Sequence, residues 1–597
     1  MLGLGRVSKR EGSRESRSAA LLEALDENAG QLEPRAFVGV HASHPREGDF
    51  EAAREGRFRV GGELRTLRPP VDWSRRPYEE SDEGAFLLNC FFFADPVMAA
   101  EVPDDTRASL FPSLAVLFED WIEQNPQDHP SPHKYAWYDH SAAARLVHLS
   151  HLLRESSRLG GLDRGQRQVL AASAIEHVDF LLADENYQHG HNHGMFSDAA
   201  LHLAADALPF IPESEEWATV AAERFRETVD RTIETTEGVH LEHSPSYQLV
   251  VRGALERFGS KGLLPESELG PLLERMDEAT AWMTAPDGTL PTIGDTSAGV
   301  EPSRAVQEAA ARSSGLRSFP RSGYCMVREG GSYLFVTAGF HSQGHKHSDD
   351  LSFCLYEDGR LLVGDAGNPG YDYESAARQF CVSPSAHSGI GLDSYTWIAD
   401  PRGGGGTGLV AAGSLGDVHA ILAQNPRIAP DDRTARRLLV YRPGQALAVI
   451  DELWATQAEL VERYLQLSPD LSATVLESGA VELGRDGGRV GWLAPFEEEG
   501  GAPDSVSALR GRTSPPMGGL YFPHVDHPVA CTTVVLSRYG GGTFGYLLSL
   551  GPADGEPEPA WVEGQLSGRS AEVVVTGIGD GPLVVQLAGD ALDLSRR

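Results

Sequence analysis

The chain has 597 residues, of which 41% are hydrophobic, so it can fill more than one hydrophobic core and we expect two or three domains. Its 51 Lys and Arg residues against 86 Asp and Glu residues give a net charge of -35, which repels nucleic acid and anionic membranes, so neither is expected as a partner. Five scattered cysteines without a Cys-x-x-Cys pair predict buried, reduced thiols rather than a disulfide framework.

The chain begins with segments that carry no strong periodic pattern. Residues 1–30 are polar and rich in Arg, Glu and Ser, which predicts a disordered leader. No apolar stretch follows its basic residues, so we identify no signal peptide and expect a cytoplasmic protein. Residues 31–84 contain strand-like runs, a turn and an extended Pro-Pro segment, and we predict that they form an entry segment.

The rest of the chain changes from a helical to a strand-like period. Across residues 85–315 apolar residues recur at helical spacing, which predicts consecutive helical hairpins in an all-α domain. The helical runs cover 142–159, 167–184, 199–211, 217–236, 246–259 and 269–286. Residues 316–597 contain short β runs, with hairpin turns at Gly330-Gly331 and Asp358-Gly359. Helices followed by hairpins predict an α+β multidomain chain, with an α domain before an antiparallel β-sandwich.

A group of histidines and an acid lies in the predicted β domain. His345 and His347 stand two residues apart, Asp365 follows a predicted hairpin, and His387 lies a short loop beyond. Two imidazoles and a carboxylate, from His347, Asp365 and His387, are a plausible set of zinc ligands. The simpler interpretation is a structural hydrogen bond for His347 and a turn cap for Asp365.

Two polar segments lie in the predicted α domain. Asn192 and His193 stand where a helix is expected to begin, and amide dipoles there can receive an anionic group. The alternative is a solvated His-rich turn with Asn192 as a helix cap. Further along, Glu242 precedes a Ser-Pro pair that opens a helix, and Tyr247 follows one turn inside it.

A third polar segment lies upstream, where Tyr138 stands just before a predicted helix and Arg145 lies inside it. Arg145 is either a clamp for a carboxylate or an ordinary partner for an ion pair on the same helix. Neither interpretation is favoured by the spacing alone.

Together these motifs resemble the heparinase II/III-type polysaccharide lyases. The resemblance rests on the order of five motifs: Asn192-His193-Gly194, the segment 242–247, the segment 345–349, the segment 364–367 and Ala386-His387. It extends to 291–295 and 71–73, and so covers most of the chain. The family implies an incomplete (α/α) toroid followed by a β-sandwich. Because it also includes alginate and oligoalginate lyases, the resemblance indicates a reaction more securely than a substrate.

The resemblance implies a carbon-oxygen lyase that acts by β-elimination on a sugar containing uronic acid. Asn192 would then stabilise the charge that develops on the substrate carboxylate. Tyr247 would be the general acid, or the base if its pKa is lowered, while His193 would be the base for the opposite face. His345 would complete this catalytic shell.

The resemblance also implies ligands and partners. Tyr138, Arg145 and Glu242 are the candidates for substrate binding. A zinc ion on His347, Asp365 and His387 would be structural and would orient His345 rather than activate water. The expected partner is an acidic oligosaccharide or polysaccharide, and the charge of -35 favours short substrates.

Two other functional classes stay open at this point, as does a homodimer. The first is a zinc-dependent hydrolase acting on a glycan, in which the same three ligands would hold a catalytic water. The second is a non-catalytic glycan-binding or assembly protein.

Overall fold

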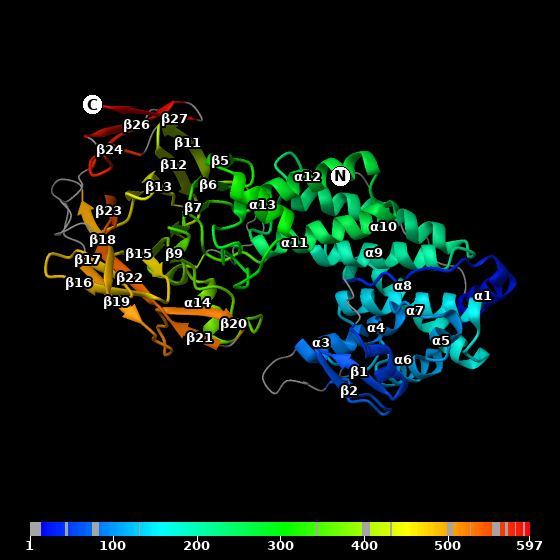
Figure 1. Cartoon of the computed structure of the whole chain (residues 1–597). Helices are drawn as coiled ribbons and strands as arrows, with labels where there is room; N and C mark the ends of the chain where they lie inside the picture. The colour runs from blue at the N-terminus through cyan, green and yellow to red at the C-terminus, as the bar shows by residue number, and fades with distance from the viewer. Residues whose placement is uncertain are drawn as a thin grey trace. The chain divides into compact units, whose positions relative to one another are not determined.

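The chain divides by packing into two compact units, seen in the computed structural model in Figure 1. The described residues are 13–41, 46–74, 83–130, 132–341, 344–396, 406–429, 431, 433–497, 505–525, 527–551, 562–566, 571–579, 581–588 and 591–597. The first unit is Met1–Thr232 with Ala254–Leu269, and the second is Ile233–Gly253 with Gly270–Arg597. This division falls beside or inside helices rather than at residue 315.

The first unit is mainly helical. Its helices are α1 (Arg14–Glu27), α2 (Asp49–Arg54), α3 (Glu83–Asn89), α4 (Asp95–Met98), α5 (Asp104–Ala108), α6 (Phe111–Gln124), α7 (Asp139–Leu159), α8 (Arg164–Leu182), α9 (Asn192–Ala207) and α10 (Glu213–Thr232), with the short turns η1 (Ala29–Gln31), η2 (Phe92–Ala94) and η3 (Asp184–Asn186). A hairpin of β1 (Arg57–Val60) and β2 (Glu63–Thr66) lies before α3. The predicted disorder is wrong for Arg14–Glu27, which is helix α1, while residues 1–12 lie outside the described residues.

Helix α7 is the central helix of the first unit. It packs against α8 and α9, and α9 also packs against α10. Every residue from Asp139 to Ser156 is buried, although many are polar. A helix that is buried on all sides must satisfy its polar groups internally, which it does through side chains such as Arg145 and His148.

Helices α11 and α12 cross the division between the units. Helix α11 (Pro245–Ala254) runs into a π-helical segment, η4 (Leu255–Leu263), and α12 (Glu266–Met283) follows. The second unit adds α13 (Arg304–Arg312), α14 (Ala376–Val382), the turn η5 (Pro384–Ala386) and a hairpin of β3 (Ile233–Glu234) and β4 (Val239–His240).

Two large sheets form the body of the second unit. Among the described residues the first has nine strands: β5 (Gly315–Phe319), β6 (Tyr324–Glu329), β7 (Ser332–Thr337), β8 (Phe353–Glu357), β9 (Arg360–Gly364), β10 (Ile390–Leu392), β15 (Leu460–Leu467), β19 (Ser505–Arg510) and β22 (Thr532–Tyr539). Its pairs are antiparallel, and β10 pairs with β15 beside the main order.

The second large sheet has twelve strands among the described residues. They are β11 (Leu409–Leu415), β12 (Val418–Asn425), β13 (Ala435–Arg442), β14 (Ala446–Leu453), β16 (Leu471–Val475), β17 (Val481–Arg485), β18 (Gly488–Glu497), β23 (Gly542–Leu550), β24 (Val562–Gln565), β25 (Glu572–Val575), β26 (Leu583–Ala588) and β27 (Ala591–Arg596). Strand β27 pairs with β11 in parallel, which adds the C-terminal strands to this sheet. A separate hairpin is formed by β20 (Leu520–His524) and β21 (His527–Ala530).

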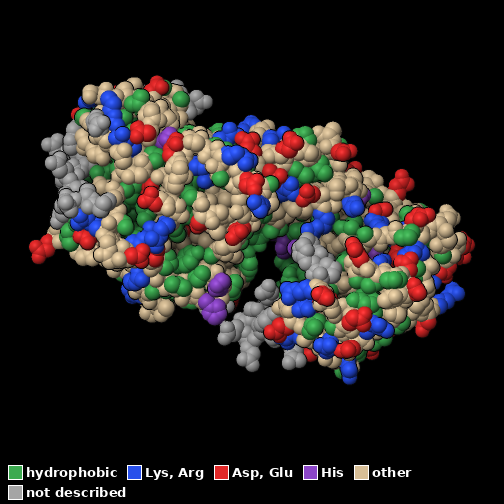
Figure 2. Space-filling model, viewed as in Figure 1, with side chains coloured by type: hydrophobic (Ala, Val, Ile, Leu, Met, Phe, Trp, Pro, Cys, Tyr) green, Lys and Arg blue, Asp and Glu red, His purple; other side chains and the backbone are tan. Residues whose placement is uncertain are grey.

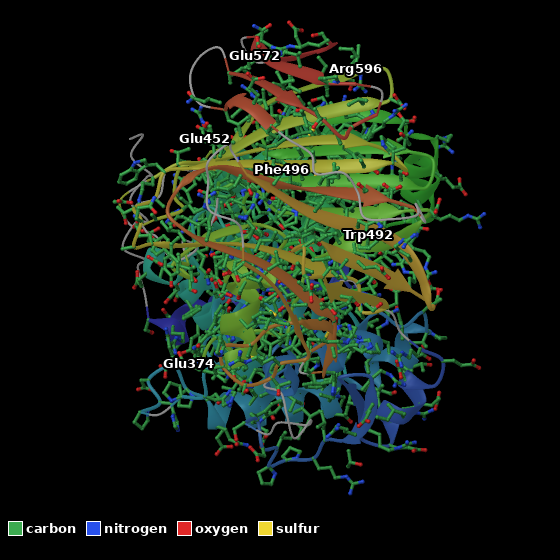
Figure 3. All side chains as sticks on the ribbon, turned by 90° about the vertical axis from the view of Figure 1, so that its left-hand side faces the viewer. Glu374, Glu452, Trp492, Phe496, Glu572 and Arg596 are labelled. Atoms are coloured by element: carbon green, nitrogen blue, oxygen red, sulfur yellow. The ribbon has the colours of Figure 1, made fainter. Side chains whose placement is uncertain are left out.

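The two large sheets share one hydrophobic core. Leu334 and Leu465 come from the nine-stranded sheet, and Leu439 and Leu548 come from the twelve-stranded sheet. A second core covers the other face of the twelve-stranded sheet, where Phe496 packs with residues of the C-terminal strands. Figure 3 shows Phe496 on β18, and Glu572 and Arg596 on C-terminal strands of the same sheet.

A third core fixes the segment that leads to the candidate site. The outer face of the nine-stranded sheet contributes Tyr333 and Phe335, which pack with Met283, Leu290 and Ile293. Residues 290–295 therefore lie against the sheet, although they form neither helix nor strand.

The predicted change from helices to hairpins is confirmed. The helical runs correspond to α7 to α12, and the Gly330-Gly331 and Asp358-Gly359 turns join β6 to β7 and β8 to β9. A helical N-terminal region and a large C-terminal β region are thus established, while a toroid and a strict sandwich stay predictions. All five cysteines are free and buried, as predicted. Among the described residues, no helix is long and apolar enough to cross a membrane.

A buried ion pair joins two neighbouring strands of the twelve-stranded sheet. Arg437 on β13 donates to both oxygens of Asp451 on β14, at 2.7 and 2.9 Å, and neither side chain is exposed. Because each charge is removed from water, either partner left alone would be an uncompensated charge in the core.

We predict that Asp451→Asn lowers the free energy of unfolding by about 3–5 kcal/mol, because the buried guanidinium loses its counter-charge. Chemical denaturation followed by circular dichroism measures this loss. The matched acid-to-amide control is Glu308→Gln, which removes an exposed pair on α13 and should cost less than about 0.5 kcal/mol. Equal effects of the two changes would contradict the prediction.

Candidate functional site

One polar group lies at the start of α9 in the first unit. The preceding turn is anchored by Tyr187, whose hydroxyl donates to Asp198 at 2.9 Å. Gly194 allows the turn to approach the helix, because a Cβ atom there would lie 2.5 Å from the carbonyl oxygen of Gln188. The turn therefore places Asn192 and His193 in the first turn of the helix, where backbone N–H groups are unpaired within the helix.

The side chain of Asn192 is buried, yet its Oδ1 atom has no hydrogen-bond partner. Buried amide groups are nearly always paired, so an unpaired one at a helix N-terminus indicates that something is missing from its surroundings. A ligand that donates a hydrogen bond, such as a sugar hydroxyl, would satisfy this oxygen, while the Nδ2 group of the same amide could donate to an anionic group.

His193 is held by Asp139, a neighbour that the sequence analysis did not select. Its Nδ1 atom lies 3.2 Å from Asp139 Oδ1, and Gln188 Nε2 donates to the other oxygen of that carboxylate at 2.6 Å. Since a carboxylate can only accept, the Asp139 contact favours a proton on Nδ1 and leaves Nε2 as the nitrogen that could take a proton. Tyr138 lies beside this imidazole, with ring centroids 5.4 Å apart.

Arg145 does not have the environment of a substrate clamp. Its side chain is fully buried, and its guanidinium donates to His177, to the Asn89 carbonyl and to the Ala136 carbonyl. It also stacks over the ring of Trp121 at 3.9 Å. The prediction that Arg145 binds substrate is therefore wrong, because the guanidinium has no exposed donor to offer.

Another polar group lies within the second unit. Tyr247, in the first turn of α11, stacks on His345 with ring centroids 3.4 Å apart and an interplanar angle of 18°. Its hydroxyl lies 2.9 Å from that of Tyr371, so one phenol donates to the other. The structure thus brings together the predicted tyrosine and histidine, which are almost 100 residues apart in sequence, and adds Tyr371.

The environment of Tyr247 favours its protonated form. Burial raises the pKa of this phenol well above its usual value, and the neighbouring Tyr371, Asp295 and Glu242 raise it further. A group with a raised pKa keeps its proton at neutral pH and can donate it.

Glu242 is buried rather than open to a ligand. One of its carboxylate oxygens lies 3.8 Å from His240 Nε2 and 3.6 Å from His345 Nε2, and the residue is only 1% exposed. The prediction that Glu242 contacts substrate directly is therefore not supported by its burial. Its position instead gives it an electrostatic influence on His345.

The predicted metal ligands do lie together. His347, Asp365 and His387 are all buried, and the ligand atoms they offer lie within 4.8 Å of one another. His387 Nδ1 donates to Asp365 at 2.6 Å and His347 Nε2 donates to Asp295 at 2.9 Å. The other nitrogens, His347 Nδ1 and His387 Nε2, are buried without a hydrogen-bond partner.

These two orphaned nitrogens fit a metal ion. A zinc-binding imidazole presents one nitrogen to the metal and donates the other N–H to a carboxylate, which is the arrangement of both histidines. Burial lowers the pKa of His347, which keeps the imidazole neutral as a ligand must be. The pKa of His387 is raised instead, because the attraction of Asp365 outweighs the effect of burial.

Asp295 and Arg378 are members of this group that residue type alone did not reveal. Asp295 accepts from both His345 and His347, and the Arg378 guanidinium pairs with its two carboxylate oxygens. Asp295 belongs to a segment noted in the family resemblance, but nothing in the sequence pointed to Arg378 on α14.

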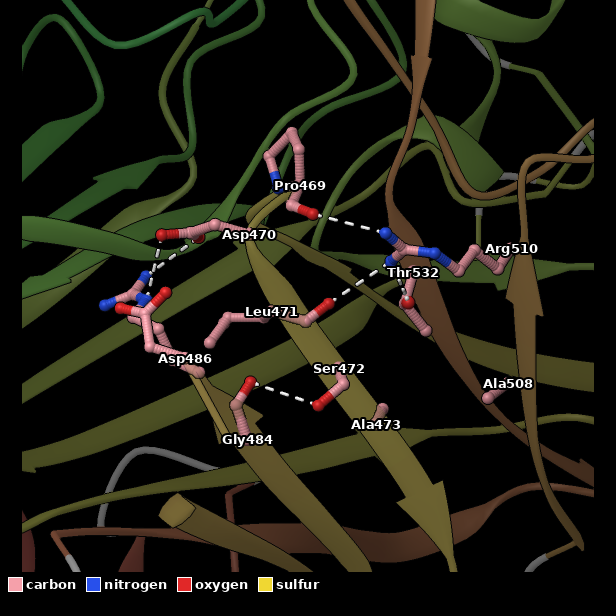
Figure 4. A pocket seen from close by; sticks show the side chains of 11 residues that line it. Pro469, Asp470, Leu471, Ser472, Ala473, Gly484, Asp486, Ala508, Arg510 and Thr532 are labelled. Carbon is pink, nitrogen blue, oxygen red and sulfur yellow. Dashed lines mark hydrogen bonds and ion pairs between the residues drawn. The ribbon is translucent and has the colours of Figure 1, made fainter. Parts of the chain in front are cut away.

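A cavity of about 480 Å³ lies elsewhere in the second unit, between β16, β17 and β19 (Figure 4). There Arg510 donates to the carbonyls of Pro469 and Leu471 and to the Thr532 hydroxyl, while Arg485 pairs with Asp470. Its lining contains no histidine or tyrosine. It is therefore not the acid-base site.

The surface is less uniformly acidic than the net charge of -35 suggests. On the visible face of each unit, basic side chains are interspersed among the acidic ones (Figure 2). Local positive potential can therefore exist on an acidic protein.

Comparison with known proteins places the chain in a family. The profile described as heparinase II/III N-terminus matches residues 62–322, and the profile described as heparinase II/III-like, C-terminal, matches residues 311–538. The two matches together cover most of the chain, and they overlap where the helical region gives way to strands.

Individual relatives are more distant. A heparin-sulfate lyase of Bacteroides thetaiotaomicron is 24% identical over 180 residues, which is 30% of this chain and 25% of that relative. The matched part thus spans a quarter of the relative's length. A crystal structure of heparinase III has a TM-score of 0.69 at 15% identity, covering 97% of this chain and 98% of that one. A heparan sulfate lyase from Pedobacter heparinus has a TM-score of 0.61 at 16% identity, covering 97% and 94%. At these identities the structures establish a shared fold.

We predict that Arg145→Met lowers the melting temperature rather than substrate affinity, because it leaves buried carbonyl groups without a donor at a cost of about 1–3 kcal/mol each. Thermal unfolding measures the effect. Arg164→Met, at the exposed start of α8, is the control and should change stability by less than about 0.5 kcal/mol. If Arg145→Met instead raised the KM for a substrate and left the melting temperature unchanged, Arg145 would be a substrate-binding residue.

Proposed function

The chain belongs to the heparinase II/III family, and from this we propose that it is a carbon-oxygen lyase that cleaves a glycan containing uronic acid by β-elimination. The observation that carries the proposal is the stack of Tyr247 on His345, with the phenol held in its protonated form. An acid that keeps its proton beside an imidazole suits a reaction in which one oxygen must be protonated as it leaves.

The reaction removes the proton α to the substrate carboxylate and breaks the bond to the 4-linked oxygen. A carbon-carbon double bond forms between the two carbons, and the leaving oxygen takes a proton. The carboxylate gains negative charge as the first proton departs, so donors placed at that carboxylate lower the barrier. Asn192 is the proposed donor through its Nδ2 group, because it lies in the first turn of α9, where the positive end of the helix dipole favours an anion.

The acid and base are assigned to different residues. Tyr247 is the proposed acid, since its raised pKa keeps the phenol protonated and leaves no phenolate to serve as the base. His193 is the proposed base, because Asp139 holds its Nδ1 atom and leaves Nε2 for the proton. His345 completes the group beside Tyr247, and Tyr371 can return a proton to Tyr247 through their 2.9 Å contact.

A zinc ion is proposed on His347, Asp365 and His387. Two observations support it. His347 Nδ1 and His387 Nε2 are buried without a hydrogen-bond partner. The other nitrogen of each imidazole contacts a carboxylate, that of Asp295 for His347 and that of Asp365 for His387. When bound, such an ion would hold the three side chains together rather than supply a reactive water.

The proposed partner is an acidic oligosaccharide or polysaccharide. The names of the relatives, heparin-sulfate lyase, heparinase III and heparan sulfate lyase, make sulfated glycosaminoglycans the first substrates to test. Alginate stays in the panel because the sequence motifs do not separate the two classes. A cytoplasmic location and a homodimer stay predictions.

We predict that the purified protein produces an ultraviolet-absorbing unsaturated product from at least one member of a panel of heparan, heparin, chondroitin, hyaluronan and alginate oligosaccharides. Tyr247→Phe should lower kcat by about 10²–10⁴-fold and Asn192→Ala by about 10²–10³-fold. Each change removes one group that acts on developing charge or on the leaving oxygen. Absorbance at the wavelength of the conjugated double bond measures the rate.

Matched controls separate chemistry from folding in this experiment. Tyr464→Phe removes a hydroxyl that donates to Glu462, and Asn186→Ala removes an amide that donates to Phe180, and both should keep their activity. Binding of a glycan without any unsaturated product would favour the non-catalytic class. Glycan cleavage without an unsaturated product, which survives Tyr247→Phe but is lost with a chelator, would favour the hydrolase.

We predict that zinc raises the melting temperature of the protein and that a chelator lowers it, because an ion that binds only the folded state stabilises it. The shift should disappear in His347→Ala and His387→Ala. His527→Ala changes an exposed histidine of β21 and should keep the wild-type shift. A melting temperature that does not respond to zinc or chelator would remove the ion from the proposal.

A further inference from the structure

The carboxylate of Asp295 contacts both histidines of the His345-Lys346-His347 segment. Its Oδ2 atom lies 3.0 Å from His345 Nδ1, and its Oδ1 atom lies 2.9 Å from His347 Nε2. One buried acid therefore contacts the imidazole that stacks on Tyr247 and an imidazole of the metal group.

These contacts determine which nitrogen of each imidazole carries the proton. A carboxylate at these distances is an acceptor, so His345 donates from Nδ1 and His347 donates from Nε2. His345 thereby presents Nε2, and His347 presents Nδ1, the orphaned nitrogen of the metal group. Arg378 Nη1 also lies 3.3 Å from His347 Nε2, because both groups reach the same carboxylate oxygen.

Asp295 is itself held firmly. The Arg378 guanidinium pairs with both of its oxygens, and its backbone N–H donates to the His345 carbonyl at 3.0 Å. The preceding Gly294 has a φ of +54°, and a Cβ atom there would lie 2.5 Å from the His345 carbonyl oxygen. Only glycine allows this approach, so backbone and side chain together fix the carboxylate against the histidine segment.

The histidine segment is irregular, and Lys346 within it pairs with Asp349 and Asp350. His345 has a left-handed backbone with a φ of 57°, which is uncommon for a residue other than glycine and persists where the surroundings impose it. The segment lies in neither helix nor strand. Asp295 is the residue that contacts the backbone and both imidazoles of this segment, so it restrains the two rings together.

We propose that Asp295 is a positioning residue that couples the metal group of His347, Asp365 and His387 to the orientation of His345. This inference rests on the proposed function for its assignment of roles to His345 and to the metal group. Asp295 is 2% exposed, and it is proposed neither as a metal ligand nor as a residue that transfers a proton. It acts through His345 and His347: by accepting a hydrogen bond from one nitrogen of each imidazole, it determines where the other nitrogen points.

The first test measures zinc affinity by competition with a chromophoric chelator, without any substrate. Asp295→Asn keeps the size of the side chain, but its single amide oxygen cannot accept from both imidazoles. We expect its zinc affinity to fall about 10–100-fold, the usual cost of losing a carboxylate behind a metal-bound histidine. Asp451→Asn also removes a carboxylate from a buried arginine in the same unit, so it controls for loss of stability, and its zinc affinity should stay near that of the wild type.

The second test measures kcat and KM on the substrate found active. In Asp295→Asn we expect kcat to fall while KM stays roughly constant, because the residue is buried away from solvent. Removal of the metal should lower kcat of the wild type. In His345→Ala and in Asp295→Asn it should lower kcat little further, because the metal, Asp295 and His345 are proposed to act through the same chain of contacts. If Asp295→Asn fails to fold, the effect of metal removal on kcat can still be compared between the wild type and His345→Ala.

The outcomes separate this inference from the proposed function. Equal zinc affinities for Asp295→Asn and Asp451→Asn would overturn the role of Asp295, even in an active lyase. Additive effects of metal removal and His345→Ala would overturn the coupling. A wild-type protein that cleaves no glycan would refute the proposed function, while the zinc measurement would still decide whether Asp295 directs His347.

Discussion

The candidate site in the second unit depends on one buried carboxylate. Placing Asp295 in the interior costs solvation energy, and the charge is tolerated because donors surround it. Two imidazole N–H groups and the Arg378 guanidinium supply them. Burial opposes ionisation, yet hydrogen bonds from His345 and His347, together with Arg378, hold the pKa of Asp295 well below its usual value. An ionised acceptor can order an irregular segment that lacks a strand's hydrogen bonds.

Burial also decides which polar residues of the first unit can meet a ligand. The guanidinium of Arg145 donates to carbonyl groups of its own unit, so it stabilises the core around α7. Asn192 is also buried, but its oxygen lacks a partner. In a chain with a net charge of -35, an amide at a helix N-terminus can bind a carboxylate without a basic residue that would require a counter-charge.

The features that the sequence predicted correctly are those with a local signature. Helices α7 to α10 follow from apolar periodicity, and the β8–β9 hairpin follows from the Asp358-Gly359 pair, where both residues have positive φ. The grouping of His347, Asp365 and His387 was also predictable, because a hairpin and a short loop bring them close.

Other features could not be predicted because they depend on contacts between distant residues. Asp295 reaches His345 across 50 residues, and Arg378 comes from a short helix without a distinctive pattern. The parallel pairing of β27 with β11 is equally remote in sequence. Arg145 was misassigned because helical spacing does not reveal whether a charged side chain faces solvent or a set of carbonyl groups.

The electrostatic surroundings of Tyr247 narrow the choice between the two proton-transfer schemes that the sequence left open. Burial, Tyr371 and two nearby carboxylates already raise the pKa of the phenol, and a bound uronate would add a further negative charge and raise it again. A tyrosine that serves as both base and acid would need a strong local cation, and Arg378, which lies over the ring of Tyr371, is already paired with Asp295. These charges favour a histidine as the base and leave Tyr247 to protonate the leaving oxygen.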